Sequence, residues 1–274
     1  MTDAESNLPP DEGPVTVSTM PPVTVPVATK RTWLVETALV MGVSLGESAI
    51  YSILSIIEKT TRHVALNQQT TSINSSVTPD RPWLDLAYQL AGVGFGVLPA
   101  LLALYLLRRT GDEASIGFDL TQPWRDLGRG FALCVAIGVP GLGVYLAARA
   151  LGLNTIVQPA NLSAAWWTIP VLILLAVMNG VLEEVVMLGY LFNRWARAGW
   201  APWVIVVVSA VIRGTYHLYQ GFGGFLGNIA MGLIFGWLYL RFKRVMPLVV
   251  AHVIIDIFAF VGYSLLAPLL PWLT

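Results

Sequence analysis

The sequence predicts an all-α fold, a polytopic transmembrane helical bundle of about seven spans. Of its 274 residues, 55% are hydrophobic and only 12% are charged, whereas a soluble domain carries about 25% charged residues. The apolar residues form runs of about 20 residues, which is the length that crosses a bilayer as a helix. Helices are favoured over open strands because lipid cannot hydrogen-bond to the backbone. A soluble globule and a disordered chain are therefore disfavoured.

Charge and cysteine content exclude further classes of protein. Sixteen Lys/Arg balance sixteen Asp/Glu without a basic run, so nucleic acid is not an expected partner. The single cysteine, Cys134, excludes an internal disulfide and a cysteine-based zinc site. The expected partners are the lipid bilayer and a molecule that is reached at the membrane.

Seven spans are expected from the apolar runs, at 33–57, 83–107, 130–151, 166–197, 201–219, 224–241 and 246–270. With this assignment, eleven of the sixteen Lys/Arg residues lie on the side of the N-terminus. The positive-inside rule then predicts a cell (cytoplasmic) membrane protein with a cytoplasmic N-terminus. The fourth run is too long for a straight span, and we expect a break at Asn179-Gly180.

Four regions follow from this assignment. They are a disordered cytoplasmic tail (1–29), N-terminal transmembrane helices with an interfacial segment (30–164), a core that holds most of the intramembrane ionisable residues (165–265) and a C-terminal end (266–274). The tail has six prolines, four acids and no Lys or Arg before residue 30, which is typical of disorder. The segment 118–129 is too polar to span, and we expect it along the interface with Trp124 as an anchor.

Polar residues form a stripe along the first span. At helical spacing it contains Ser44, Glu47, Ser48, Tyr51, Ser52 and Ser55. Such a stripe faces the bundle interior or a wet cavity. Hydrogen bonding between helices and the lining of a substrate groove both explain it, so Glu47 is a candidate substrate-binding residue. Asn228, in the glycine-rich sixth span, is a second candidate, with helix packing as the alternative.

Ionisable residues concentrate in the last hundred residues. They are Glu183, Glu184, Arg213, His217, His252 and Asp256. Each costs about 2.5–3.5 kcal/mol at bilayer depth on insertion scales, so their clustering indicates function. Residues four positions apart share a helix face, which pairs Arg213 with His217 and His252 with Asp256. The adjacent glutamates point about 100° apart, so we expect one at a reaction centre and the other on a structural partner.

These groups can activate water for peptide-bond hydrolysis in two ways. Glu183, His217 and His252 are suited to bind a divalent metal such as zinc, which would lower the pKa of its water. Alternatively, Glu183 is itself the general base, while His252 and Asp256 position the water or stabilise an oxyanion. The metal-dependent and metal-free mechanisms are equally open at this point.

Three motifs in the same region resemble those of the CAAX-protease and bacteriocin-processing (CPBP, or Abi) family of intramembrane proteases, relatives of the type II CAAX prenyl endopeptidase. That family has Glu-Glu-x-x-x-Arg, Phe-x-x-x-His and His-x-x-x-Asn/Asp. The corresponding segments here are Glu183-Glu184-Val-Val-Met-Leu188, Arg213-Gly-Thr-Tyr-His217 and His252-Val-Ile-Ile-Asp256. The resemblance covers about residues 165–265 and implies an intramembrane endopeptidase that acts on a peptide or protein substrate.

By this resemblance, Glu183 is the water-activating base and His217 holds the water. His252 and Asp256 complete the site, and Glu184 is its charged support. Two positions depart from the motifs, because Leu188 replaces the arginine and Arg213 replaces the phenylalanine.

We expect that Arg213 supplies the missing positive charge, to Glu184, although such a pair is also a common structural pin. The alternative functions are a non-catalytic membrane scaffold and a proton-coupled transporter. Transporters often contain paired broken helices, and only one broken segment is predicted here.

Overall fold

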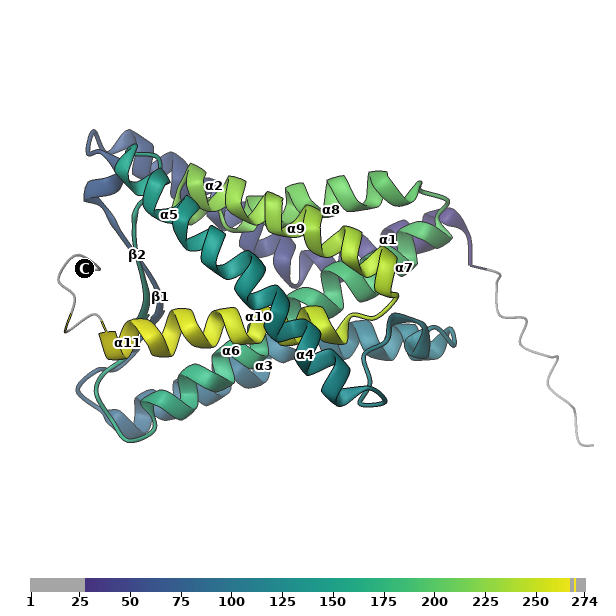
Figure 1. The fold of residues 1–274 in the computed structure, drawn as a ribbon, viewed down its shortest axis with the longest axis horizontal. Coiled ribbons are helices and arrows are strands. Elements are labelled where there is room, and N and C mark those ends of the chain that lie inside the picture. The colour runs from purple at the N-terminus through teal and green to yellow at the C-terminus, as the bar shows by residue number, and fades with distance from the viewer. Residues whose placement is uncertain (1–27, 267–268, 270–274) are drawn as a thin grey trace, which may run out of the picture.

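Long apolar helices dominate the computed structural model, which describes residues 28–266 and residue 269. Almost all of the predicted tail (1–29) and most of the C-terminal end (266–274) lie outside the described residues. Within these described residues, five helical segments are long and apolar enough to cross a membrane. They are Pro82–Arg109 (α3), Pro123–Ala150 (α4 and α5), Thr168–Arg197 (α6 and α7), Phe222–Phe242 (α9) and Met246–Leu266 (α10 and α11) (Figure 1). The predicted all-α polytopic bundle is confirmed.

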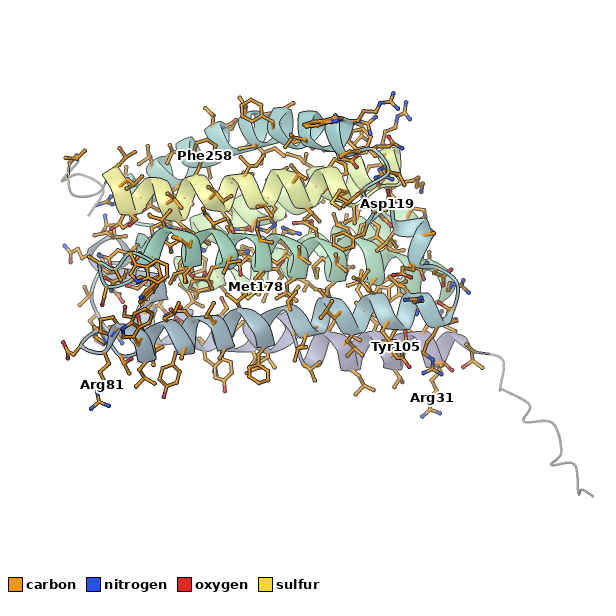
Figure 2. The ribbon with its side chains drawn as sticks, turned by 90° about the horizontal axis from the view of Figure 1, so that it is seen from below. Arg31, Arg81, Tyr105, Asp119, Met178 and Phe258 are labelled. Atoms are coloured by element: carbon orange, nitrogen blue, oxygen red, sulfur yellow. The ribbon has the colours of Figure 1, made fainter. Side chains whose placement is uncertain are left out.

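The outer face of the bundle is apolar, and side chains project from the helices on every side of the view in Figure 2. Large apolar residues such as Leu39, Ile50 and Phe95 are exposed there. The main core lies inside, around Val185–Phe192. An apolar exterior around a packed interior is what a lipid environment requires, because apolar side chains facing lipid need no cover.

The first predicted span, 33–57, is not one straight helix. Helices α1 (Lys30–Gly42) and α2 (Leu45–Thr61) meet at an angle of 56°. The break is tight, since a Cβ on Gly46 would lie 2.6 Å from the carbonyl oxygen of Met41. The prediction of a single helix was therefore wrong. Its physical reason is a local close approach of the backbone that hydropathy does not report.

The second half of the predicted interfacial segment (118–129) is helical in the structure. Residues Pro123–Leu133 form α4, which continues through a wide π-helical turn into α5 (Val139–Ala150). Trp124 is exposed in the first turn of α4. The polar start of this helix is stabilised by Arg244, whose Nη2 lies 2.7 Å from Asp126 Oδ2. The segment is therefore the end of a long helix, because that ion pair satisfies its buried carboxylate.

No break occurs at Asn179-Gly180, contrary to the prediction. Helix α6 (Thr168–Glu184) passes through this point and continues by a π-helical turn (Val185–Tyr190) into α7 (Leu191–Arg197). Gly180 serves packing instead, since a Cβ there would lie 2.6 Å from Val253 Cγ2 of α10. This glycine brings α10 (Met246–Ile257) close to α6, next to the glutamates.

The remaining helices enclose α6. Helix α8 (Pro202–Tyr216) is a shorter apolar helix that packs on α9 (Phe222–Phe242) and on α2. Helix α10 packs between α6 and α4, and it continues through a π-helical turn into α11 (Tyr263–Leu266). Helices α6, α8 and α10 thus converge. They carry five of the six predicted intramembrane ionisable residues, and the sixth, His217, directly follows the last residue of α8.

A small parallel sheet, which the sequence did not predict, lies at the end of the bundle opposite α1 (Figure 1). It pairs β1 (Thr70–Ser75) with β2 (Ile156–Asn161). The two strands join the loop after α2 to the loop after α5. The loop after His217 lies at the same end, because Asn154, just before β2, forms an antiparallel bridge with Gly221.

Candidate active site

Glu183 and Glu184 occupy the last turn of α6, immediately before the π-helical turn. Such wide turns are frequent at functional sites. Glu184 is fully buried, whereas Glu183 keeps 7% of its surface exposed. The two carboxylates therefore differ as expected for adjacent residues on a helix, and only Glu183 retains access.

Arg213 of α8 bridges both carboxylates. Its Nη2 donates to Glu184 Oε1 at 2.7 Å, and its Nη1 lies 3.4 Å from Glu183 Oε2. The expected ion pair with Glu184 is thus present. Leu188, where the family motif has arginine, is buried in the apolar core. In this chain the cation beside the two carboxylates is supplied by α8.

The C-terminal end of α8 brings two more side chains to Glu183. The Tyr216 hydroxyl donates to Glu183 Oε2 at 2.7 Å. His217 Nε2 lies 3.7 Å from the same oxygen. The amide of Gln220 lies 3.4 Å from His217 Nδ1. Because an amide NH₂ can only donate, Nδ1 is the acceptor in this contact, and a hydrogen on Nε2 would face Glu183.

Helix α10 completes the cluster from the other side. His252 Nδ1 lies 2.7 Å from Glu184 Oε1, and its Nε2 lies 3.8 Å from Asp256 Oδ1. Asp256 Oδ2 accepts a hydrogen bond of 3.3 Å from Asn179 Nδ2 of α6. The imidazole of His252 is therefore oriented by a carboxylate on each side.

Three polar atoms of this cluster are buried without a hydrogen-bond partner among the described residues: Glu184 Oε2, Arg213 Nη1 and His217 Nε2. Buried polar groups are rarely left in this state, because each costs about 1–3 kcal/mol. Three such atoms within one ion-pair cluster indicate a place where a further polar group binds.

Comparison with known families addresses the same segment. Residues 165–258 match the family model described as type II CAAX prenyl endopeptidase Rce1-like. This segment matches the CAAX protease family. No curated protein and no solved structure matches the chain. The resemblance inferred from the three motifs is confirmed, and the matched segment contains Glu183, Glu184, Arg213, His217, His252 and Asp256.

A metal ion has a partial set of donors in this CAAX-protease segment. Ligand atoms of Glu183, Glu184 and His252 lie within 4.8 Å of one another. This set differs from the predicted one, in which His217 stood in place of Glu184. Carboxylates and imidazole suit zinc. However, the guanidinium of Arg213 bridges both carboxylates, and the 2.7 Å between Glu184 Oε1 and His252 Nδ1 is a hydrogen bond. The arrangement does not fit a metal.

The two candidate substrate-binding residues lie in different settings. Glu47 lines a groove of about 360 Å³ between α2 and the end of α8. Asn228 is half-buried, and its Nδ2 donates to Gly224 O of its own helix at 3.0 Å. Glu47 therefore faces a groove, whereas the side chain of Asn228 is hydrogen-bonded within its own helix.

Sequence analysis missed Tyr216 and Asn179 as members of the site. Their positions contain usable signals, because Asn179 lies one helical turn before Glu183, on the same face. Tyr216 precedes His217 within the second motif. Each donates a hydrogen bond to one carboxylate of the cluster.

A clamp of four side chains holds the turn that follows His217. Ser52 Oγ accepts from the backbone N–H of Tyr219 at 2.6 Å, and Lys59 Nζ donates to its carbonyl at 2.5 Å. Lys59 Nζ also donates to Thr71 Oγ1, which hydrogen-bonds to Thr155 Oγ1. Thr155 Oγ1 in turn donates to Gln220 O. Helix α2, β1 and the segment before β2 therefore fix the loop that carries the imidazole.

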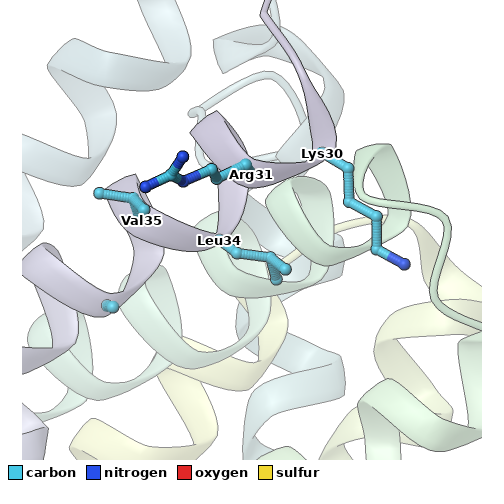
Figure 3. A pocket seen from close by; sticks show the side chains of 5 residues that line it. Lys30, Arg31, Leu34 and Val35 are labelled. Atoms are coloured by element: carbon cyan, nitrogen blue, oxygen red, sulfur yellow. The ribbon is translucent and has the colours of Figure 1, made fainter.

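A second hollow, of about 490 Å³, lies beside the start of α1. Lys30, Arg31, Leu34, Val35 and Ala38 line it (Figure 3). None of these side chains is a carboxylate or an imidazole. The carboxylates and imidazoles of the candidate site therefore lie in the cluster of α6, α8 and α10 and not here.

Proposed function

We propose that the chain is an intramembrane endopeptidase that hydrolyses a peptide bond within or beside the membrane, with Glu183 as the base that activates water. The convergence of Glu183, His217 and His252 from three segments carries the proposal. Glu183 Oε2 is held by Tyr216 and Arg213, and its other oxygen, Oε1, accepts no hydrogen bond within the described part of the chain. That oxygen is free to take a proton.

The reaction follows from these positions. Glu183 Oε1 removes a proton from water, and the resulting hydroxide attacks the carbonyl carbon of the scissile peptide. The hydrogen on His217 Nε2 donates to the carbonyl oxygen as negative charge develops there. Glu183 then returns the proton to the leaving nitrogen as the C–N bond breaks, which yields an acid and an amine.

The other residues orient these groups. Tyr216 and Arg213 fix the plane of the Glu183 carboxylate, and Arg213 balances the two adjacent negative charges. Glu184 and Asp256 orient His252 beside the base. In a buried site such fixed charges act more strongly than in water, because little solvent screens them.

The test is cleavage of a pool of apolar peptides by the purified full-length protein in detergent. Glu183→Gln should lower turnover by at least about 10²-fold, the usual contribution of a general base, while its thermal unfolding stays close to wild type. Glu58→Gln, an exposed residue of α2 paired with Arg62, is the matched control. A strong chelator should leave turnover unchanged.

Each contrary result is informative. Full turnover in Glu183→Gln would remove the base, and loss of turnover with the chelator would establish a metal-dependent mechanism. No cleavage by the wild type, together with proton or solute movement after reconstitution, would favour the transporter alternative. No cleavage and no transport would favour the scaffold.

We further propose that the chain lies in the cytoplasmic membrane with its N-terminus inside. The support is the bias of Lys and Arg toward the N-terminal side of the bundle. Single cysteines placed at Lys30 and at Arg62 on a Cys134→Ser background should differ in labelling by an impermeant thiol reagent in intact cells. Labelling of the residue 30 position before lysis would reverse this orientation.

A further inference from the structure

The polar stripe of α2 forms one wall of a groove that ends at the active site. The groove has a volume of about 360 Å³ and is lined by Glu47, Ser48, Tyr51, Ser52, Ser55, Tyr216 and Tyr219. Its volume falls in the range of about 300–1,000 Å³ that is common for ligand sites. Polar side chains of the stripe, such as Ser48 and Ser55, therefore face the groove.

Tyr216 connects the groove to the catalytic carboxylate. Its ring lines the groove, and its hydroxyl donates to Glu183 Oε2 at 2.7 Å. Ser52, also in the lining, holds the backbone of Tyr219 at the same end. A molecule in the groove is thus separated from the proposed base by one side chain.

Glu47 gives this groove a charge. It is exposed and lies near the middle of the bent pair Lys30–Thr61, which is long and apolar enough to enter a membrane. Within the described part of the chain its carboxylate makes no hydrogen bond or ion pair, and no Lys or Arg lines the groove with it. A lone carboxylate at bilayer depth is costly and is usually matched by a partner.

We propose that the groove binds an extended peptide segment of the substrate and that Glu47 pairs with a Lys or Arg side chain of that segment. This inference rests on the proposed endopeptidase function and specifies its substrate class. The hydroxyls of Ser48 and Ser55 supply donors and acceptors to the peptide backbone, which lipid cannot satisfy. The basic side chain supplies the charge that this chain lacks beside Glu47.

The test measures binding in the absence of turnover. Short fluorescent apolar peptides that differ only in one central Lys, Gln or Glu are titrated against the full-length Glu183→Gln variant in detergent. The Lys peptide should bind about tenfold or more tightly than the Gln peptide, the difference expected for a charge-assisted contact. Adding Glu47→Gln should reduce this ratio toward one, and Glu47→Lys should make the Glu peptide the preferred one.

Glu58→Gln, the same substitution on the same helix outside the groove, should keep the preference for Lys. Equal binding of the three peptides, or a preference that survives Glu47→Gln, would overturn the inference. Because binding and cleavage are measured separately, the inference about Glu47 can fail while cleavage by the wild type establishes the protease. Conversely, it can succeed in a chain that cleaves nothing, which would leave a peptide-binding scaffold.

Discussion

Two buried arginines of this molecule have opposite kinds of surroundings. Arg194 of α7 is fully buried, and each of its nitrogens has a partner. Its Nε donates to Glu36 Oε1 at 2.7 Å, Nη2 donates to Leu106 O at 2.8 Å, and Nη1 reaches Asp112, Thr110 and Asn193. Arg213 of α8 is equally buried, but its Nη1 has no hydrogen-bond partner among the described residues.

The difference distinguishes a structural pin from the proposed reaction site. A cluster in which every donor is satisfied has nothing left to offer a ligand, and its burial serves the fold. Around Arg213, Glu184 Oε2 and His217 Nε2 share with Nη1 the lack of a hydrogen-bond partner within the part of the chain that the structure describes. The cluster around Arg213 therefore differs from the cluster around Arg194 in its incomplete hydrogen bonding, and not in burial or charge. The comparison predicts that mutations in the first cluster lower stability and that mutations in the second lower turnover.

The largest expected effect is on stability at the first cluster. Arg194→Met leaves Glu36 and Asp112 without their buried cation and should cost about 3–5 kcal/mol of unfolding free energy, measured by unfolding in detergent. Arg197→Met is the matched control, because Arg197 is 41% exposed in its ion pair with Asp112 and should cost at most about 1 kcal/mol. Turnover per folded molecule should persist in both variants. Equal, small losses of stability in the two variants would contradict the role of Arg194 as a structural pin.

The next effect is on catalysis at the second cluster. His217→Ala removes the proposed donor to the oxyanion and should lower the turnover number by about 10²–10³-fold, measured by peptide cleavage. Its stability should change little, since the ring has one weak hydrogen bond, to Gln220 at 3.4 Å. Thr215→Ala, which removes a bond only to Val211 O, should retain turnover. A destabilised but active His217→Ala would reverse the assignment.

The sequence predicted the second cluster better than it predicted the helices that carry it. The cost of ionisable groups in lipid and the four-residue spacings pointed to Glu183, Arg213 and His252, and the absence of arginine at Leu188 pointed to the Arg213–Glu184 pair. These signals are local or chemical. The transmembrane bundle was also predictable, because hydropathy and length determine which segments can span.

What the sequence could not give depends on contacts between distant segments. The Asn179-Gly180 pair looked like a break, but Gly180 admits α10 and Asn179 binds Asp256. The parallel strands β1 and β2 pair residues about 86 positions apart, for example Thr71 with Val157, which no local periodicity reports. The clamp on the turn after His217 is hidden for the same reason.

A smaller effect is expected at the clamp on the turn after His217, which contributes both to the fold and to the position of the imidazole. Lys59→Met keeps the length of the side chain but removes the donor to Tyr219 O and Thr71 Oγ1. The loop of His217 should loosen, and the turnover number should fall by about tenfold, the value of about one lost hydrogen bond to a charge. The Michaelis constant should change less, and Lys30→Met should change neither. A loss of stability with full turnover would make Lys59 another structural pin.

The smallest effect is expected at a third arginine cluster, where exposure weakens the interaction. Arg244 Nη2 lies 3.0 Å from Asp119 Oδ1, and its hydrogen bond, with those from Thr121, lowers the pKa of Asp119 from 3.8 to about 2. Because the pKa is lower in the folded state, the pair stabilises fully above about pH 4 and is lost as the pH falls through about 2.

The Asp119 side chain is 37% exposed, so Asp119→Asn should cost only about 0.2–1 kcal/mol at neutral pH. The difference from wild type in detergent unfolding should stay constant down to about pH 4 and vanish near pH 2. A cost as large as that of Arg194→Met would mean that burial does not decide the strength of these clusters. The difference in stability between the arginine clusters would then depend on hydrogen bonding alone.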